Sequence, residues 1–135
     1  MSLEIEQRER EGVVILSMKG RITLGLEATA LRNKVSDLNA EGNRNLVFMM
    51  AGVDYIDSTG LGALVMTASS LRKNGGNVKL VGLNRRNIEL LVMTKLATIF
   101  EIFGDEQDAI NSYFPDRKLK TFDILSFVNE MKKED

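Results

Sequence analysis

The sequence predicts an α/β fold in which a mixed, mostly parallel β-sheet is flanked by helices. Three observations lead to this fold class. Segments with strand character alternate with segments of helical periodicity, an order typical of parallel sheets. One predicted strand, residues 46–51, is apolar at every position, as expected for a central strand covered on both faces. The length of 135 residues is that of one ordinary domain.

The first half of the chain supplies two strands, a helix and the central strand. Residues 3–7 have strand character, Gly12 provides a turn, and alternating residues make 13–18 a strong strand. After a loop, apolar residues at helical spacing predict a helix over 26–39. Because the first two strands are joined by a short turn, we expect them to pair antiparallel, with 46–51 in the middle of the sheet.

The second half continues the alternation of helices and strands. One apolar stripe runs along a predicted helix over 60–73, and a short apolar strand follows over 78–83. Asn84 and Asp105 are residue types that begin helices as N-caps. Each is therefore expected to open a helix, and the two helices are separated by a last short strand over 98–103.

The predicted domain covers residues 1–114, and residues 115–135 form a tail. Within the tail, 115–120 is expected to be a connector and 121–133 an extra C-terminal helix. A helix of this length is marginal in water unless it packs against something. We expect it to dock on its own domain, which favours a monomer, whereas exchange between two chains would make a dimer. Its apolar residues are Phe122, Leu125, Phe127, Val128 and Met131.

The composition excludes several classes of function. The 18 basic and 19 acidic side chains leave a formal charge of −1, so we expect no direct nucleic-acid binding. The chain has no Cys and no His, which removes thiol catalysis, histidine acid–base chemistry and Cys or His metal ligands. We therefore expect a protein that is not an enzyme and has no cofactor or metal. No apolar run approaches the roughly 20 residues of a membrane span and the start lacks a signal-peptide pattern, so we expect a cytoplasmic protein.

The most informative segment is 53–62, with the sequence VDYIDSTGLG, which joins the central strand to the next helix. Ligand and partner sites gather at the carboxyl ends of strands in open α/β sheets. Asp57, Ser58 and Thr59 are all residue types that cap helices, and the two glycines would let the helix pack close to the sheet. A purely structural role is therefore one interpretation of this segment.

Three functional interpretations compete with it. Gly60 and Gly62 resemble part of a dinucleotide fingerprint, but the third small position holds Val65 and the expected acidic residue is missing. Ser58 lacks the preceding glycine of a hydrolase elbow and a His base, so we reject it as a nucleophile. The remaining interpretation is an exposed hydroxyl that another protein phosphorylates, either on Ser58 or on Thr59.

Several segments carry a resemblance to a known family. They are LVFMMAGV (46–53) followed by YIDSTGLGALV (55–65), together with GRITLGLEATALR (20–32), GGNVKLVGLNRRNIELLVMTKL (75–96) and IFEIFGDEQDAI (99–110). On these segments the chain resembles a STAS domain, and specifically an anti-sigma factor antagonist. The resemblance covers about residues 3–114, and the tail lies outside it.

The resemblance implies a regulatory binding protein. Such proteins bind an anti-sigma factor, often a serine kinase, and release the sigma factor that it holds. The kinase phosphorylates the signature serine, here Ser58, which ends the antagonism, and a phosphatase restores it. Many members carry an Asp in the loop after the second strand, near the partner surface, where this chain has Thr23. The alternative is an unphosphorylated STAS scaffold or interaction module of a larger signalling or transporter complex.

Charge and helix geometry suggest how phosphorylation would act and where a partner would bind. A phosphate adds about −1.5 to −2 charge to a corner that already holds Asp54 and Asp57, so it would repel an acidic partner surface. At about 100° per residue, Met66 and Ser69 share one stripe of the helix with Ser58. Met66 is either an adaptable contact or ordinary surface. The expected partner-binding residues are Thr23, Asp54, Asp57, Ser58, Thr59, Gly60, Leu61, Gly62, Met66 and Ser69.

Overall fold

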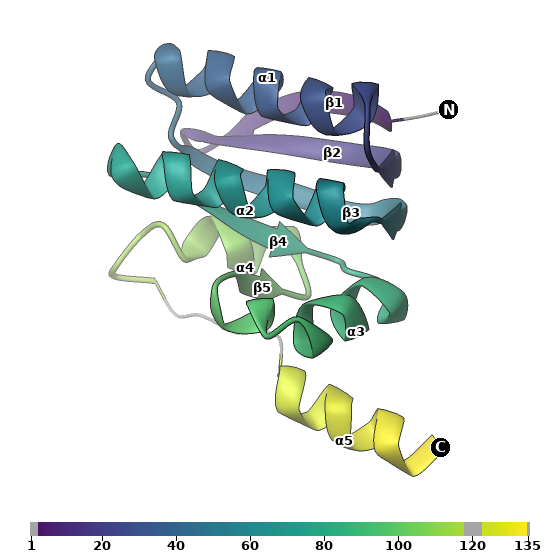
Figure 1. Ribbon diagram of the computed structural model, residues 1–135. Helices are drawn as coiled ribbons and strands as arrows, with labels where there is room; N and C mark the ends of the chain where they lie inside the picture. Colours follow the sequence, from purple (N-terminus) through teal and green to yellow (C-terminus); the bar gives the residue numbers. More distant parts are fainter. Residues whose placement is uncertain (1–2, 118–122, 135) are drawn as a thin grey trace.

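The structure is a computed structural model that describes residues 3–117 and 123–134. A five-stranded sheet has the order β1-β2-β3-β4-β5, and only the first pair of strands is antiparallel (Figure 1). The strands are β1 Leu3–Arg10, β2 Val13–Ile22, β3 Asn45–Ile56, β4 Asn77–Val81 and β5 Glu101–Phe103. The helices are α1 Leu26–Ala40, α2 Ser58–Lys73, α3 Arg85–Met93, α4 Glu106–Asn111 and α5 Ile124–Glu134, with a 3-10 turn, η1, at Leu96–Thr98. The predicted fold class is confirmed.

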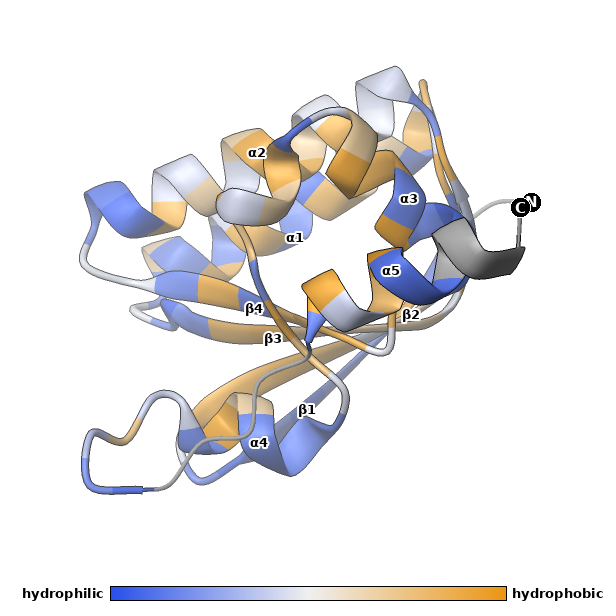
Figure 2. Ribbon diagram, turned by 90° about the horizontal axis from the view of Figure 1, so that it is seen from below, coloured by the Kyte–Doolittle hydropathy of each residue, from blue (hydrophilic) through white to orange (hydrophobic). Residues whose placement is uncertain are grey.

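Helices cover both faces of the sheet. Figure 2 shows α1, α2 and α3 on one side and α4 on the other. Because side chains alternate along a strand, β2, β3, β4 and β5 each contribute apolar residues to both faces. The two faces accordingly hold two separate clusters of buried side chains, a larger one under α1–α3 and a smaller one under α4. This arrangement explains why the central strand is apolar at successive positions.

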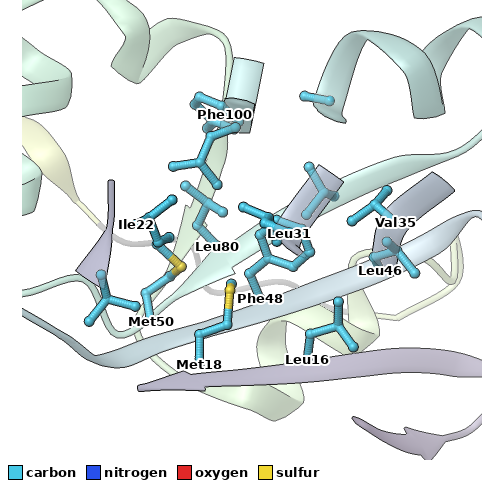
Figure 3. Packing of buried hydrophobic residues seen from close by; sticks show 14 of the residues in the cluster. Leu16, Met18, Ile22, Leu31, Val35, Leu46, Phe48, Met50, Leu80 and Phe100 are labelled. Carbon is cyan, nitrogen blue, oxygen red and sulfur yellow. The ribbon is translucent and has the colours of Figure 1, made fainter. Parts of the chain in front are cut away.

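The larger cluster is organised by the parallel register of the strands. Leu16, Phe48, Leu80 and Ile102 lie opposite one another on β2, β3, β4 and β5, and all are buried. Side chains from α1, including Leu31, pack against this row (Figure 3). Packing against this row of side chains holds α1 and α2 over the sheet. The start of α2 therefore lies at the carboxyl ends of β2 and β3.

Two strands extend further than the sequence predicted. Residues 20–25 were expected to form a loop, but β2 continues to Ile22, and the expected end of the central strand at 51 was wrong because β3 continues to Ile56. The extension has a physical reason, which is pairing between the two strands: Arg21 lies opposite Tyr55 and Ile22 opposite Ile56. Asp54 and Tyr55 therefore lie on the extended strand, and Asp57 follows it as the N-cap of α2.

Other boundaries differ by shorter lengths. The strand expected over 98–103 begins only at Glu101, because the residues before it form the η1 turn, and the strand expected over 78–83 ends at Val81. The N-caps predicted at Asn84 and Asp105 are both confirmed, since each side chain accepts hydrogen bonds from the first turn of its helix. Local capping chemistry was therefore more predictable than strand length.

The tail helix α5 lies next to α3 in both views (Figures 1 and 2). Ile124 is half-buried and packs against the larger cluster, whereas Leu125 is 70% exposed. Phe122, which was expected to contribute to this helix, lies outside the described residues. For the tail as a whole, docking on its own domain rather than on a second chain stays a prediction.

Candidate functional site

The candidate site is the corner where β2 and β3 end and α2 begins, and Asp57 organises it. One carboxylate oxygen of Asp57 accepts a hydrogen bond from the Gly60 N–H at 2.7 Å, which caps α2. The other accepts from the Leu24 N–H at 2.9 Å. The Asp57 N–H in turn donates to the Ile22 carbonyl at 3.3 Å. Asp57 thus joins the end of β2, the following loop and the first turn of α2.

These hydrogen bonds also fix the ionisation of Asp57. The bonds from Gly60 and then from Leu24 lower the pKa of its carboxyl group, because backbone N–H donors favour the charged form. Asp57 is therefore a negative charge at neutral pH, placed at the positive end of the α2 dipole. Its carboxylate has a structural task in addition to any contact with a partner.

Ser58 is the first residue of α2 and is exposed. Because Asp57 supplies the cap, Ser58 is not required for it, and within the described residues its hydroxyl makes no hydrogen bond. Thr59 follows it in the helix and is exposed as well. The structure therefore separates two roles that the sequence left open: Asp57 caps the helix, and Ser58 presents a free hydroxyl at its N-terminus.

The two glycines of the motif have different environments. Gly60 is buried, and a Cβ placed on it would lie 1.8 Å from the Ile22 carbonyl oxygen, so only glycine allows α2 to approach β2 this closely. Leu61 is buried in the larger cluster. These two expected partner-binding residues therefore pack inside the molecule rather than on its surface. Gly62 is exposed, and among the described atoms a Cβ there would meet nothing within 4 Å.

A groove between α1 and α2 opens on one side of Ser58. Thr59, Gly62 and Met66 line it, and Met66 is 59% exposed, as expected from the helical spacing. Leu24 of the loop before α1 and Leu26, the first residue of α1, are 72% and 84% exposed. Leu24 lines the same groove, together with Gly25, Ala28, Thr29, Arg32 and Ala63.

Neither Leu24 nor Leu26 was among the partner-binding residues expected from the sequence. The available signal was Leu24, an apolar residue in an expected loop. Leu26 was expected as the first residue of the following helix, where nothing in the sequence indicated its exposure. Gly25 has a φ of 105°, a conformation that favours glycine. Thr23, two residues earlier, is half-buried, and its carbonyl accepts a hydrogen bond from the Ala28 N–H.

A second groove opens on the other side, between the start of α2 and α3. Ser58 lines this groove, which has a volume of about 380 Å³. Tyr55 is 41% exposed and Met93 81% exposed along this groove, and the Arg86 guanidinium lies over the Tyr55 ring at 5.4 Å. Neither Tyr55 nor Met93 was selected from the sequence, because their exposure depends on where α3 packs. Its other lining residues are Ile56, Asp57, Leu61, Asn87, Glu89, Leu90 and Thr94.

The remaining expected residues lie around these grooves. Asp54 is exposed near the end of β3, and Ser69 is exposed further along α2 beside Met66, on an adjoining hollow. Within residues 3–117 and 123–134, no group of three or more metal-ligating side chains could hold an ion. What the corner offers is an accessible hydroxyl between exposed apolar side chains, which suits a protein interface.

Comparison with known proteins identifies the family. The model of the STAS domain family matches residues 4–109. The chain belongs to the STAS domain family. An anti-sigma-B factor antagonist from Bacillus subtilis (strain 168) is 32% identical over 110 residues, which are 82% of this chain and 99% of that protein. The anti-sigma-F factor antagonist RsfB from Mycobacterium tuberculosis (strain ATCC 25618 / H37Rv) is 27% identical over 106 residues, 77% of this chain and 86% of that protein. The chain is thus grouped with the anti-sigma factor antagonists of the family.

Solved structures of similar proteins have the same fold. A proposed anti-sigma factor antagonist from Thermotoga maritima superposes with a TM-score of 0.74 at 26% identity, over 80% of this chain and 92% of that one. A sulfate transporter family protein from Wolinella succinogenes gives 0.64 at 26% identity, over 77% and 85% of the two chains. In the described part of the present chain, no helix is both long and apolar enough to cross a membrane.

Proposed function

We propose that this STAS protein is an anti-sigma factor antagonist that is switched off by phosphorylation of Ser58. The observation that carries the proposal is the free Ser58 hydroxyl at the first position of α2, between two grooves lined by exposed apolar side chains. Its relatives are named anti-sigma factor antagonists, which supports an anti-sigma factor as the partner. The partner is an anti-sigma factor that acts as a serine kinase, a phosphatase reverses the modification, and the protein itself is not an enzyme.

The geometry suggests how a phosphate would end binding. A phosphoryl group on Ser58 would lie at the N-terminus of the 16-residue α2, where the dipole favours negative charge, so the domain should keep its fold. The same charge would lie in the groove that Tyr55 and Met93 line. In a packed interface the phosphate would lose its water without gaining a compensating donor, and Asp54 would add repulsion toward an acidic partner surface.

A direct test is to screen anti-sigma factors from the same genome for a complex with the purified chain. Each candidate would be mixed with the chain and ADP or ATP, and the complex would be followed by native mass spectrometry. We expect one stable complex that dissociates as ATP is consumed and phosphate appears on the chain. Absence of any complex with every candidate would contradict the proposal.

A second candidate function is an interaction module in a transporter-associated or signalling assembly that is never phosphorylated. The observation in its favour is the structural likeness to a sulfate transporter family protein. The two functions differ in one measurable respect. A scaffold would bind its partner equally well before and after incubation with ATP, whereas an antagonist would be released.

A further inference from the structure

Strand β1 forms one edge of the sheet. It pairs with β2 over all eight of its residues, without a bulge, and along its other side the described residues place no further strand. The side chains of Glu4, Glu6, Gln7, Arg8 and Glu9 are exposed, so this edge is open to solvent. An unpaired edge of this length presents backbone N–H and C=O groups to any second strand that fits.

The two faces of β1 have different roles. Leu3 and Ile5 are half-buried against the larger cluster, under α1–α3. The even-numbered side chains point to the opposite face, where Arg8 and Arg10 form ion pairs with Glu106 of α4. Along this second face the charges change sign once: the strand begins with two acidic residues, Glu4 and Glu6, and ends with the two arginines.

This order of charges is complementary to itself. When two copies of a sheet join at an edge about a two-fold axis normal to the sheet, the edge strands run antiparallel and directly opposed residues share one face. With the axis at Gln7, Glu4 lies opposite Arg10 and Glu6 opposite Arg8 of the second copy. Sliding the strands to the neighbouring registers that preserve the faces brings Glu6 opposite Glu6, or Arg8 opposite Arg8, and like charges directly opposed are destabilising.

We propose that β1 is a self-recognition edge, through which two copies of this chain form a dimer with a continuous sheet centred on Gln7. Backbone hydrogen bonds between the two β1 strands supply the attraction, and the charged pairs select the register. The inference is independent of the proposed function. It also differs from the monomer expected from the sequence. The proposed dimer surface is β1, which lies at the opposite end of the sheet from the tail helix α5 (Figure 1).

The intramolecular ion pairs leave room for this second set of contacts. Arg8 and Arg10 form ion pairs with the same carboxylate of Glu106, and Glu6 and Glu11 lie close enough to attract Arg8 and Arg10 as well. Their side chains remain 45% and 41% exposed, whereas Glu106 is 19% exposed. Charged residues on an edge strand usually oppose pairing. Here the second copy would bring the carboxylates of its Glu4 and Glu6 to accessible guanidinium groups that already contact Glu106 of α4.

Cross-linking tests the register directly. At the two-fold axis the two Cα atoms of residue 7 would be about 4.5–5.5 Å apart, which is within disulfide range. The chain has no Cys, so Gln7→Cys introduces the only thiol. We expect Gln7→Cys in the full chain to form a disulfide-linked dimer under mild oxidation, while the exposed control Glu41→Cys stays mostly monomeric. Equal cross-linking of the two variants would overturn the proposal.

Charge reversal tests the source of the specificity. Glu4→Arg/Glu6→Arg turns every opposite-charge pair of the dimer into a like-charge pair, and neither residue takes part in an ion pair with another described residue. The control Asp37→Arg/Glu41→Arg makes the same change of net charge on exposed positions of α1 and its C-cap. By sedimentation at low salt, we expect the β1 variant to dimerise at least about tenfold more weakly than the wild type, and the control to match the wild type.

Circular dichroism of each variant establishes that the fold is retained. A wild type that stays monomeric at low salt up to the highest soluble concentration would contradict the dimer. A dimer that persists in Glu4→Arg/Glu6→Arg would equally contradict it, and would point to assembly through the tail helix.

Discussion

Asp57 and Leu24 are joined by a hydrogen bond of 2.9 Å although they are 33 residues apart in the sequence. The bond ties the exposed loop before α1 to the residue that caps α2. The bond therefore holds three features together as one surface. They are the two leucines at and after that loop, the Ser58 hydroxyl and the first turn of α2. The same carboxylate thus supports both the fold and the shape of the proposed interface.

Replacing Asp57 should loosen this corner without unfolding the domain. In Asp57→Ala the cap of α2 and the tie to Leu24 are both lost, so we expect the Tm to fall by a few degrees. Asp57→Asn keeps an acceptor for the Gly60 N–H but has only one carbonyl oxygen, so its Tm should lie between the other two. Differential scanning calorimetry would measure the series. Identical Tm values for wild type and Asp57→Ala would show that the hydrogen bonds of Asp57 contribute nothing to stability.

The stabilising effect of Asp57 should depend on pH in a defined direction. Its pKa is lowered in the folded state from the ordinary value of 3.8, chiefly by the Gly60 N–H. Its contribution is therefore complete above the unfolded pKa and is lost as the pH falls through the lower, folded value. We expect the Tm difference between wild type and Asp57→Ala to be constant from pH 7 to pH 5 and to shrink below about pH 4. A difference that grew on acidification would contradict this assignment.

Two glycines of the same helix should respond oppositely to alanine. Gly60→Ala places a Cβ 1.8 Å from the Ile22 carbonyl oxygen, so α2 must move and the free energy of unfolding should fall by about 1–3 kcal/mol or more. Gly62→Ala adds a methyl group to an open surface and should raise it by about 0.5–1 kcal/mol. Urea denaturation of both variants provides the comparison. A gain of stability in both variants would show that helix propensity, and not the close approach to Ile22, governs position 60.

Met66 should matter for binding and not for folding. Met66→Lys removes an exposed apolar side chain from the groove beside Ser58, and we expect at least about a tenfold loss of affinity for the anti-sigma factor with unchanged Tm. Leu125→Lys is the matched control, because Leu125 is also an exposed apolar residue but lies on α5. Isothermal titration calorimetry would measure both. Equal affinities for wild type and Met66→Lys would place Met66 among ordinary surface residues.

The sequence predicted features that depend on near neighbours. Helix α2 follows from the spacing of Leu61, Leu64, Ala68 and Leu71, which are all buried, and the caps at Asn84 and Asp105 follow from local hydrogen bonding. The motif that begins α2 could also be located, because it combines capping residues with small ones after an apolar strand.

Features that depend on distant parts of the chain could not be predicted in the same way. The last residues of β3 are strand only because Arg21 and Ile22 of β2 pair with them. The second hydrogen bond of Asp57 depends on the position of Leu24, and the exposure of Tyr55 and Met93 depends on the packing of α3. Composition and periodicity carry no information on such long-range geometry.

The central claim is that Ser58 is the switch, and the most direct measurement joins modification to affinity in one experiment. The chain, its anti-sigma factor and ATP would be incubated, the modified residue mapped by peptide mass spectrometry, and the purified phosphoprotein titrated against the anti-sigma factor. We predict phosphate on Ser58 alone, an affinity at least about tenfold lower than that of the unmodified chain, and a nearly unchanged Tm, with Ser58→Ala binding normally and accepting no phosphate. Phosphate on Thr59 or on neither residue, or full affinity after modification of Ser58, would contradict the claim.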